Sequence, residues 1–247
     1  MSFSSAPQSC KPLPPVALLC GGKATRLGPL AGSKPKALLP VAGEPFIAHQ
    51  LRFLRQQGIR RVVICSGYLS EQIEAFVGDG GRFDLDVRFS NDGPTLLGTG
   101  GAVKKALPFL DKVFFILYGD SYLDIDFAAV RDAFEASGKE GLLTVFRNEG
   151  KWDTSNIEFS AGIIRRYDKI NRAPQMNFID YGLGIVRESV FKRWSNNLPF
   201  DLADLYKQLV EEENLAGFEA SNRFYEIGSE AGLAETDSWL RKQPTRI

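Results

Sequence analysis

The 247-residue sequence has little histidine and no excess charge of either sign. It contains a single histidine, His49, and its 30 Lys and Arg residues are balanced by 30 Asp and Glu residues. One histidine excludes histidine-rich zinc sites and argues against a Ser-His-Asp catalytic triad. Proteins that bind nucleic acid by neutralising its phosphates usually have a basic excess, so we expect no nucleic-acid partner.

The sequence also lacks long hydrophobic runs, and its number of cysteines is odd. The longest apolar runs, residues 16–20 and 113–117, are far too short to span a bilayer, and the polar, Pro-rich residues 1–15 lack the apolar segment of a signal peptide. Three widely spaced cysteines are typical of reduced thiols and not of a disulfide framework. We therefore expect a cytoplasmic protein that binds no membrane, with residues 1–15 as a loose tail.

Continuous apolar segments alternate with amphipathic segments along most of the chain. Strands that are apolar on both faces and are separated by helices are typical of a parallel sheet covered on both sides. The sequence therefore predicts an α/β protein with three α/β/α layers and a mixed, mostly parallel central sheet. Strands are expected at residues 16–20, 61–66, 85–90 (an edge strand), 112–118 and 142–147, and helices at residues 45–57, 69–77, 102–110, 127–137, 202–212 and 231–241.

Residues 151–184 differ from the rest, because their pattern suggests short polar strands and turns. No internal repeat, low-complexity block or long linker separates them from their neighbours. A chain of this length is sufficient for one large α/β domain. We therefore expect a single domain over residues 16–247, with an α+β-like insertion in its second half.

The loop after the first predicted strand is rich in glycine and in cations. Gly21 and Gly22 have no Cβ, so their backbone N–H groups can approach a phosphate closely, and Arg26, Lys34 and Lys36 supply positive charge. The loop has roughly twenty residues, whereas such connections usually have about two to six, and this length indicates a function. It is not a Walker A loop, because no Gly-Lys-Ser/Thr closes it. We interpret it as a polyphosphate cradle; a basic, solvated loop is the alternative.

Two more loops are expected at the same edge of the sheet, where ligands of open α/β sheets bind. Gly119-Asp120 follows the strand at residues 112–118, and a carboxylate there, beside a phosphate cradle, is well placed to hold Mg²⁺. Gly-Asp pairs are also common in turns. Residues 97–102, Leu-Gly-Thr-Gly-Gly-Ala, open a predicted helix. They leave three roles open: capping the helix, binding an anion, or packing a flat base on bare backbone.

Together these motifs resemble those of the sugar-1-phosphate nucleotidyltransferases, which make nucleotide sugars from a nucleoside triphosphate (NTP) and a sugar 1-phosphate. The likeness continues to FYEIGSEAGLAE at residues 224–235 and so covers nearly the whole chain after residue 15. Two positions depart from the family pattern: Ala24 replaces a glycine, and Glu226 replaces a metal-binding Asp. In this sequence, the residues that match the opening signature of the family are Leu19, Gly21, Gly22, Thr25, Arg26, Leu27, Pro35, Lys36 and residues 38–41, Leu-Leu-Pro-Val.

The resemblance implies the Rossmann-like nucleotide-diphospho-sugar transferase fold and a role for each matching residue. Arg26 would bind the triphosphate and its pyrophosphate leaving group, and Lys36 would bind at the α-phosphate. Asp120 and Glu226 would hold Mg²⁺. The implied nucleotide-binding residues are Leu19, Gly21, Gly22, Thr25, Gly98 and Thr99. The implied sugar-phosphate-binding residues, in a part spanning roughly residues 150–230, are Asn156, Lys169, Asp180 and Gly182. For Asn156 and Asp180, a role as turn formers at strand ends is the alternative.

The implied reaction needs no histidine. A sugar phosphate oxygen attacks the α-phosphorus of the NTP, and pyrophosphate leaves. Because the second pKa of such a phosphate is about 6, the nucleophile is already ionised at pH 7 and needs no general base. The reaction instead needs in-line alignment and neutralisation of charge between two anions.

The residues constrain the class of reaction more closely than they constrain the substrates. The short chain and the stretch IDYGLG at residues 179–184 look most like the heptose 1-phosphate guanylyltransferases, which favours GTP and D-glycero-D-manno-heptose 1-phosphate. A uridylyltransferase acting on N-acetylmuramate or another hexose 1-phosphate is an alternative, and so is a cytidylyltransferase acting on a non-sugar phosphate. A non-catalytic, regulatory subunit that binds a sugar nucleotide is the alternative of another class. We expect a monomer or a homodimer.

Lys36 provides the first test. We predict that Lys36→Ala abolishes turnover, because the reacting phosphates lose a cation that neutralises them. The fold should remain intact, as judged by circular dichroism, and pyrophosphate release measures the turnover. A nearly normal rate in this variant would contradict the role of Lys36.

Overall fold

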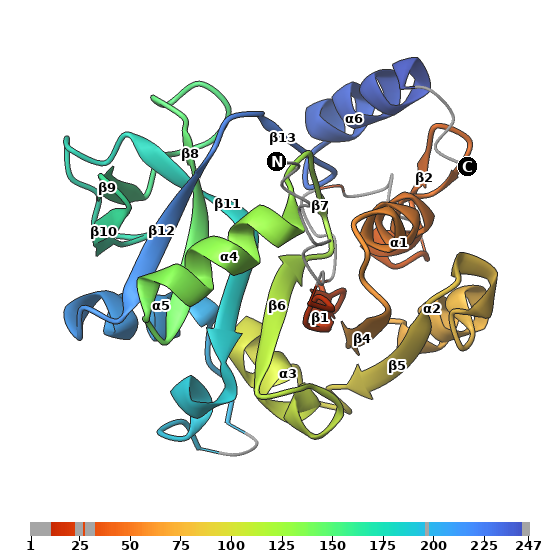
Figure 1. Ribbon diagram of the computed structural model, residues 1–247. Coiled ribbons are helices and arrows are strands. Elements are labelled where there is room, and N and C mark those ends of the chain that lie inside the picture. Colours follow the sequence, from red (N-terminus) through yellow and green to blue (C-terminus); the bar gives the residue numbers. More distant parts are fainter. Residues whose placement is uncertain (1–10, 23–26, 28–32, 196–197, 244–247) are drawn as a thin grey trace, which may run out of the picture.

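The computed structural model, which describes residues 11–22, 27, 33–195 and 198–243, contains one large sheet with helices on both faces (Figure 1). Nine strands form this sheet in the order β5-β4-β1-β6-β11-β8-β12-β10-β9. The strands are β1 (Val16–Leu19), β4 (Arg61–Ser66), β5 (Asp86–Asn91), β6 (Val113–Tyr118), β8 (Gly141–Arg147), β9 (Ile157–Ser160), β10 (Ile163–Tyr167), β11 (Phe178–Arg187) and β12 (Leu215–Ala220).

The directions of the strands confirm that the sheet is mixed, as predicted. Neighbours β5, β4, β1 and β6 are parallel, and so are β8 and β12. Strand β11 is antiparallel to β6 and to β8, and β10 is antiparallel to β12 and to β9. All strands except β10 and β11 therefore run in one direction, and β5 lies at an edge, as predicted.

Burial on both faces explains why the strands are continuously apolar. In β1, Val16 and Leu18 belong to one hydrophobic cluster and Ala17 to the other, on the opposite face of the sheet. Strand β6 divides in the same way, with Phe115 in the first cluster and Phe114 in the second. Each side chain of these strands thus removes apolar surface from water, which is the main stabilisation of such a sheet.

Helices cover the two faces of the sheet and complete both hydrophobic clusters. Helices α1 (Phe46–Gln56), α2 (Ser70–Val77) and α4 (Phe127–Ser137) contribute to the first cluster, and α3 (Gly98–Ala106) and α5 (Leu202–Glu211) contribute to the second. The last helix, α6 (Glu230–Lys242), lies near the short strands outside the main sheet (Figure 1). Those strands pair as β2 (Pro40–Val41) with β3 (Glu44–Pro45) and β7 (Ser121–Leu123) with β13 (Phe224–Glu226).

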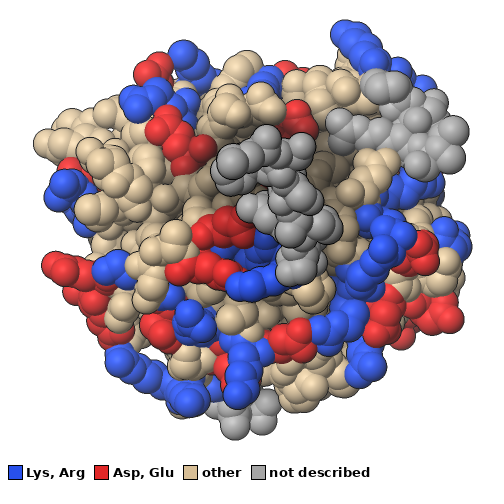
Figure 2. Space-filling view, in the orientation of Figure 1, with Lys and Arg blue, Asp and Glu red and all other residues tan. Residues whose placement is uncertain are grey.

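Charges of both signs share one face of the molecule (Figure 2). Figure 2 shows basic and acidic side chains interspersed over one face of the molecule, in keeping with the equal totals of the two kinds. Within the described part of the chain, no helix combines the length and the apolar character needed to cross a bilayer.

The structure differs from the sequence-based expectation near the start of the chain. Residues 11–15, which were expected to belong to a loose tail, are held by the protein. The Lys11 ammonium lies 3.1 Å from a Glu135 carboxylate oxygen, and the Lys11 carbonyl accepts a hydrogen bond from the Arg131 guanidinium at 2.8 Å. Pro15 then accepts a hydrogen bond from the backbone N–H of Phe115, which leads the chain into β1. The earlier residues of the expected tail lie outside the described part.

Strand β11 is a second difference. Short polar strands were expected between residues 151 and 184, but β11 has ten residues, lies in the middle of the sheet and is almost wholly buried. The regular pairing of β11 with β8 is interrupted between Asp180 and Gly184. Asp180 and two glycines in this interruption break the apolar pattern, so the sequence did not indicate a core strand here.

Helix α4 provides a test of local stability. Its N-cap residue, Asp126, accepts hydrogen bonds from the backbone N–H groups of Ala128 and Ala129 at 2.8 and 3.2 Å. We predict that Asp126→Ala lowers the free energy of unfolding by about 1 kcal/mol, because both donors lose their partner. Urea denaturation measures the change. Asp126→Asn, which keeps a capping oxygen, is the control, and equal losses in the two variants would show that the cap is not the cause.

Candidate active site

Two cavities adjoin at the carboxyl ends of the parallel strands. The first, of about 370 Å³, is lined by Leu19, Gly21, Gly22, Lys36, Gly98 and Thr99 among others. The second, of about 350 Å³, is lined by Asn156, Lys169, Asp180, Gly182 and Glu226 among others. Tyr118 and Asp120 border both cavities. The structure thus groups the residues that the sequence motifs associate with nucleotide and those associated with sugar phosphate into two neighbouring cavities. Thr25 and Arg26 lie outside the described residues.

Asp120 occupies a tightly built turn after β6. The backbone N–H of Gly119 donates a hydrogen bond to the carbonyl oxygen of Leu19 at 3.0 Å. A Cβ at Gly119 would lie only 2.3 Å from that oxygen, so no residue with a side chain fits there without a shift. This close approach to β1 fixes the backbone that carries Asp120.

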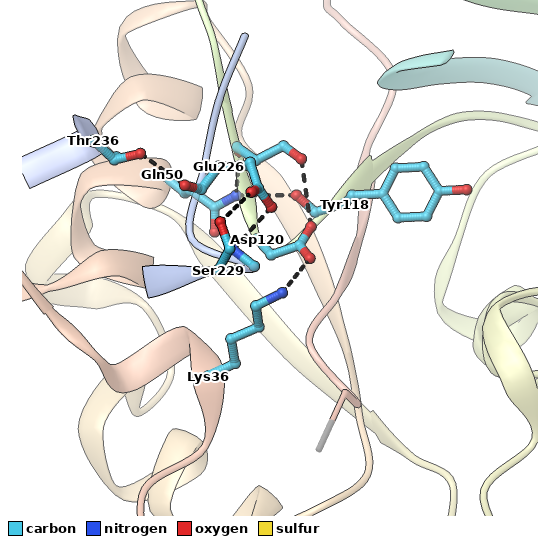
Figure 3. Close-up of polar contacts among 9 residues, drawn as sticks. Lys36, Gln50, Tyr118, Asp120, Glu226, Ser229 and Thr236 are labelled. Atoms are coloured by element: carbon cyan, nitrogen blue, oxygen red, sulfur yellow. Dashed lines mark hydrogen bonds and ion pairs between the residues drawn. The ribbon is translucent and has the colours of Figure 1, made fainter. Parts of the chain in front are cut away.

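Lys36 forms an ion pair with Asp120 across this site. Its Nζ lies 2.6 Å from Asp120 Oδ2, and its side chain is only 14% exposed (Figure 3). Lys36 opens the short 3-10 helix η2 (Lys36–Leu38), and it lines the first cavity. The pair places one cation and one carboxylate where the two cavities meet.

Glu226 lies on the other side of the same turn, although it is distant in sequence. In the pairing of β13 with β7, Glu226 is opposite Ser121, and the backbone N–H of Ile227 donates to the Asp120 carbonyl oxygen at 3.0 Å. The Glu226 carboxylate accepts hydrogen bonds from the Gly228 N–H at 2.9 Å and from the Ser229 hydroxyl at 3.2 Å (Figure 3). The structure therefore brings together the two carboxylates that the sequence motifs associate with metal.

The donor set at this turn is compatible with Mg²⁺. Among the described residues there is no cluster of three or more Asp, Glu, His or Cys side chains that could hold a metal ion. Mg²⁺, however, is usually held by one or two carboxylates together with substrate phosphates and water. Asp120 and Glu226 fit that pattern, because both border the second cavity and Asp120 also borders the first.

The start of helix α3 has a role that the sequence left open. The N–H groups of Gly100 and Gly101 donate to the carbonyl oxygen of Phe200 at 3.0 and 3.3 Å, so neither is free to bind an anion. Gly98 has φ +71°, and a Cβ there would lie 2.5 Å from the Phe200 oxygen. The Thr99 hydroxyl accepts a hydrogen bond from the Leu202 N–H at 2.8 Å. The glycines thus join α3 to the start of α5, and the helix begins at residue 98, before the expected residue 102.

Two cysteines line the first cavity without being reactive. Cys20 and Cys65 are buried free thiols, and burial raises the pKa of both well above its ordinary value. A thiol that stays protonated at neutral pH is a poor nucleophile. Both therefore serve as small apolar residues at the ends of β1 and β4.

In the second cavity, Asp180 is bound firmly by its neighbours. Its carboxylate accepts hydrogen bonds from the Gly182 N–H at 3.0 Å and from the Tyr167 hydroxyl at 3.2 Å. Its own N–H donates to Asn156 Oδ1 at 3.1 Å. Burial raises the pKa of Asp180, although Lys169 and these hydrogen bonds oppose the shift. Asn156 and Asp180 therefore help to shape the backbone here, which is the structural alternative raised from sequence, and both also face the cavity.

Two residues in the centre of the site had not been singled out from sequence. Tyr118 separates the cavities, with Lys169 Nζ lying 5.6 Å from the centre of its ring. In the sequence, its position directly before Gly119-Asp120 could have identified Tyr118 as a site residue. Gln50 holds the same turn from helix α1, and nothing in its local sequence distinguishes it from other polar residues of that helix.

Comparison with known proteins agrees with this geometry. The family model described as nucleotidyl transferase matches residues 16–182, and the chain therefore belongs to that family. This result confirms the fold class and the enzyme class that the motifs implied. The matched residues include those around Lys36, Asp120 and Asn156, and they end before Glu226.

Two relatives match almost their whole length. The N-acetylmuramate alpha-1-phosphate uridylyltransferase of Neisseria meningitidis serogroup B is 27% identical over 225 residues, which cover 90% of this chain and 96% of the relative. The D-glycero-alpha-D-manno-heptose 1-phosphate guanylyltransferase of Campylobacter jejuni is 24% identical over 211 residues, which cover 85% of this chain and 93% of the relative. Other relatives are longer: the match spans half of the bifunctional protein GlmU of Methanococcus maripaludis.

The fold is also found among solved structures. HddC from Yersinia pseudotuberculosis superimposes with a TM-score of 0.75 at 19% identity, and the match covers 92% of this chain and all of HddC. At this identity the likeness supports the fold alone.

The raised pKa of Asp180 leads to a test of stability against pH. Burial disfavours the charged form of this carboxyl in the folded protein, so Asp180→Asn should remove a cost in stability at any pH where the unfolded chain holds it as a carboxylate. We predict that this variant melts at a higher temperature than the wild type at pH 7. The difference should shrink as the pH falls toward about 4, the ordinary pKa of the carboxyl, because the unfolded chain then binds the proton as well and the cost of the buried charge disappears. Thermal unfolding followed by circular dichroism checks this, and a constant difference at all pH values would contradict it.

Proposed function

We propose that this protein transfers a nucleotidyl group from an NTP to the phosphate of a sugar 1-phosphate and releases pyrophosphate. A bond forms between a phosphate oxygen of the sugar and the α-phosphorus, and the bond from the α-phosphorus to the bridging oxygen of the β-phosphate breaks. The observation that carries this proposal is the junction of two cavities at Asp120, with Lys36 beside it. Two substrates bound in these cavities would meet there.

Each cavity has residues suited to one of the two substrates. In the first, Gly21 and Gly22 at the end of β1 leave room for phosphates close to the backbone, and Gly98 and Leu19 offer a flat apolar surface to a base. In the second, Lys169 supplies a cation for the sugar phosphate, while Asn156, Asp180 and the backbone at Gly182 supply polar groups for sugar hydroxyls. Thr99 lines the first cavity while its hydroxyl caps α5, so its contribution would be to shape the wall.

Positioning and charge neutralisation account for the chemistry. Lys36 would neutralise the α-phosphate as the sugar phosphate approaches, and Arg26, which the structure does not describe, would act on the leaving pyrophosphate. Asp120 and Glu226 would hold Mg²⁺, which when bound supplies positive charge to the reacting phosphates. No residue has to remove a proton, because the attacking phosphate is ionised at neutral pH. In-line alignment by these residues is therefore the main catalytic contribution.

For the substrates, we propose GTP and D-glycero-D-manno-heptose 1-phosphate. The motif at residues 179–184 favours this pair, and the relative from Campylobacter jejuni carries a matching name. UTP with N-acetylmuramate 1-phosphate is the second candidate, since the relative from Neisseria meningitidis is similar over a slightly larger share of the chain. The two candidates differ in both base and sugar, so one set of assays separates them.

The experiment is pyrophosphate release with each of the four NTPs and a set of sugar 1-phosphates that includes heptose, N-acetylmuramate and glucose. We predict that GTP with heptose 1-phosphate gives the highest kcat/KM, with at least roughly tenfold discrimination against the other pairs. Activity should disappear when EDTA removes divalent metal. Lys36→Ala is the control for contaminating enzymes.

Three outcomes bear on the proposal. A higher rate with UTP and N-acetylmuramate 1-phosphate would overturn the choice of substrates and leave the reaction in place. Release with a non-sugar phosphate alone would overturn the sugar 1-phosphate. No release with any pair, combined with measurable binding of a sugar nucleotide, would favour a regulatory subunit and overturn the proposed reaction.

A further inference from the structure

Gln50 is a buried polar residue of helix α1 that reaches the turn carrying Asp120. It is 2% exposed. Its side-chain Nε2 donates hydrogen bonds to the carbonyl oxygen of Tyr118 at 3.1 Å and to that of Ser121 at 2.8 Å. Figure 3 shows the Gln50 amide beside this turn, on the side away from the Tyr118 ring. One side chain thus binds the backbone on both sides of Gly119-Asp120.

The turn needs such a contact because the chain changes its partner there. Strand β6 pairs with β1 and β11 up to Tyr118, and β7 then leaves the main sheet to pair with β13. The turn is also held by backbone hydrogen bonds, from Gly119 to Leu19 and from Ile227 to Asp120, and its Asp120 carboxylate is bound by Lys36 and by the Ser121 hydroxyl. Among the described residues, only Gln50 bonds both flanking carbonyls through a side chain.

The chemistry of the amide fits this task. A glutamine amide nitrogen has two N–H donors, and both are used here on two carbonyl acceptors. The reversed amide would place an oxygen against these carbonyls, so the orientation follows from the partners. Glutamate has the same length but offers no donor when ionised, and methionine has the same length without any donor. Gln50 lines neither cavity, so it does not meet the substrates itself.

We propose that Gln50 is a positioning residue that sets the place of the Asp120 carboxylate at the junction of the two cavities. This inference rests on the proposed function, because it assumes that Asp120 holds Mg²⁺ during nucleotidyl transfer. Loss of the two hydrogen bonds frees the Tyr118 and Ser121 carbonyls, and the turn relaxes around Asp120. The metal site then loses its arrangement, although every side chain that lines the two cavities is kept.

The test is Gln50→Met, with steady-state kinetics and metal binding as the two readouts. We predict that the apparent Mg²⁺ activation constant rises and kcat falls, each by about 10- to 100-fold, which is usual when a residue behind a metal ligand is lost. Mn²⁺ binding in the presence of a non-hydrolysable NTP analogue, measured by electron paramagnetic resonance, should weaken by a similar factor. Excess Mg²⁺ should restore part of the rate. If Gln50→Met does not fold, Gln50→Asn, which keeps an amide that is one methylene shorter, replaces it with the same readouts.

The matched control is Gln57→Met, at the end of the same helix. Gln57 Oε1 accepts a hydrogen bond from the Phe127 N–H at 3.1 Å, and Gln57 lines neither of the two cavities. This variant should lose thermal stability while its Mg²⁺ activation constant stays at the wild-type value. If both variants lose only stability, Gln50 is merely structural and the inference is wrong.

Asp120→Asn separates failure of this inference from failure of the proposed function. If Asp120→Asn keeps wild-type activity and Mn²⁺ affinity, the proposed metal site is wrong and the role of Gln50 falls with it. If Asp120→Asn loses both while Gln50→Met keeps both, the proposed function stands and the inference about Gln50 alone is overturned.

Discussion

The ion pair between Lys36 and Asp120 is the interaction on which the rest of the site depends. It joins the loop after β1 to the turn after β6 at 2.6 Å and lies where both cavities meet. The turn itself exists only because Gly119 lets its backbone approach Leu19 closely. Removing one partner of a partly buried pair leaves the other charge without compensation, so the two residues constrain each other. The short strands β7 and β13 bring Glu226, from the C-terminal part of the chain, next to this turn.

Charged groups are also balanced locally, where the two cavities meet. Lys36 is paired with Asp120, and the Glu226 carboxylate is bound by the Gly228 N–H and the Ser229 hydroxyl. Charged groups held in this way cost little in stability, because each has a partner before any substrate arrives. Asp180 differs, since burial outweighs the effect of Lys169 and raises its pKa. Burial therefore disfavours the charged form of Asp180, in contrast to the charged groups at the junction of the two cavities.

Much of the fold could be predicted from the sequence, because β1, β4 and β6 are buried on both faces and read as continuous apolar runs. The ends of these strands also located the glycine loop and Asp120. The predictions that were wrong concern features set by residues distant in the sequence. Helix α3 begins at Gly98 because of hydrogen bonds to the Phe200 carbonyl. Strand β11 lies in the core of the sheet although it contains Asp180. In the site, the proximity of Glu226 to Asp120 followed only from family resemblance. Gln50 could not be found, since its two acceptors lie 68 and 71 positions along the chain.

The arrangement of the sheet divides the site into two kinds of contribution. The parallel half, β5, β4, β1 and β6, ends in the loops around Gly21 and Asp120, where charge neutralisation and alignment are needed for any nucleotidyl transfer. The other half contains both reversed strands, β10 and β11; strand β11 provides Asp180 to the second cavity, and neighbouring loops provide Asn156 and Lys169. Lys36 and Asp120 belong to other segments, after β1 and after β6. A single scaffold can therefore keep one reaction while its sugar substrate changes, which agrees with the different substrates named for relatives of similar length.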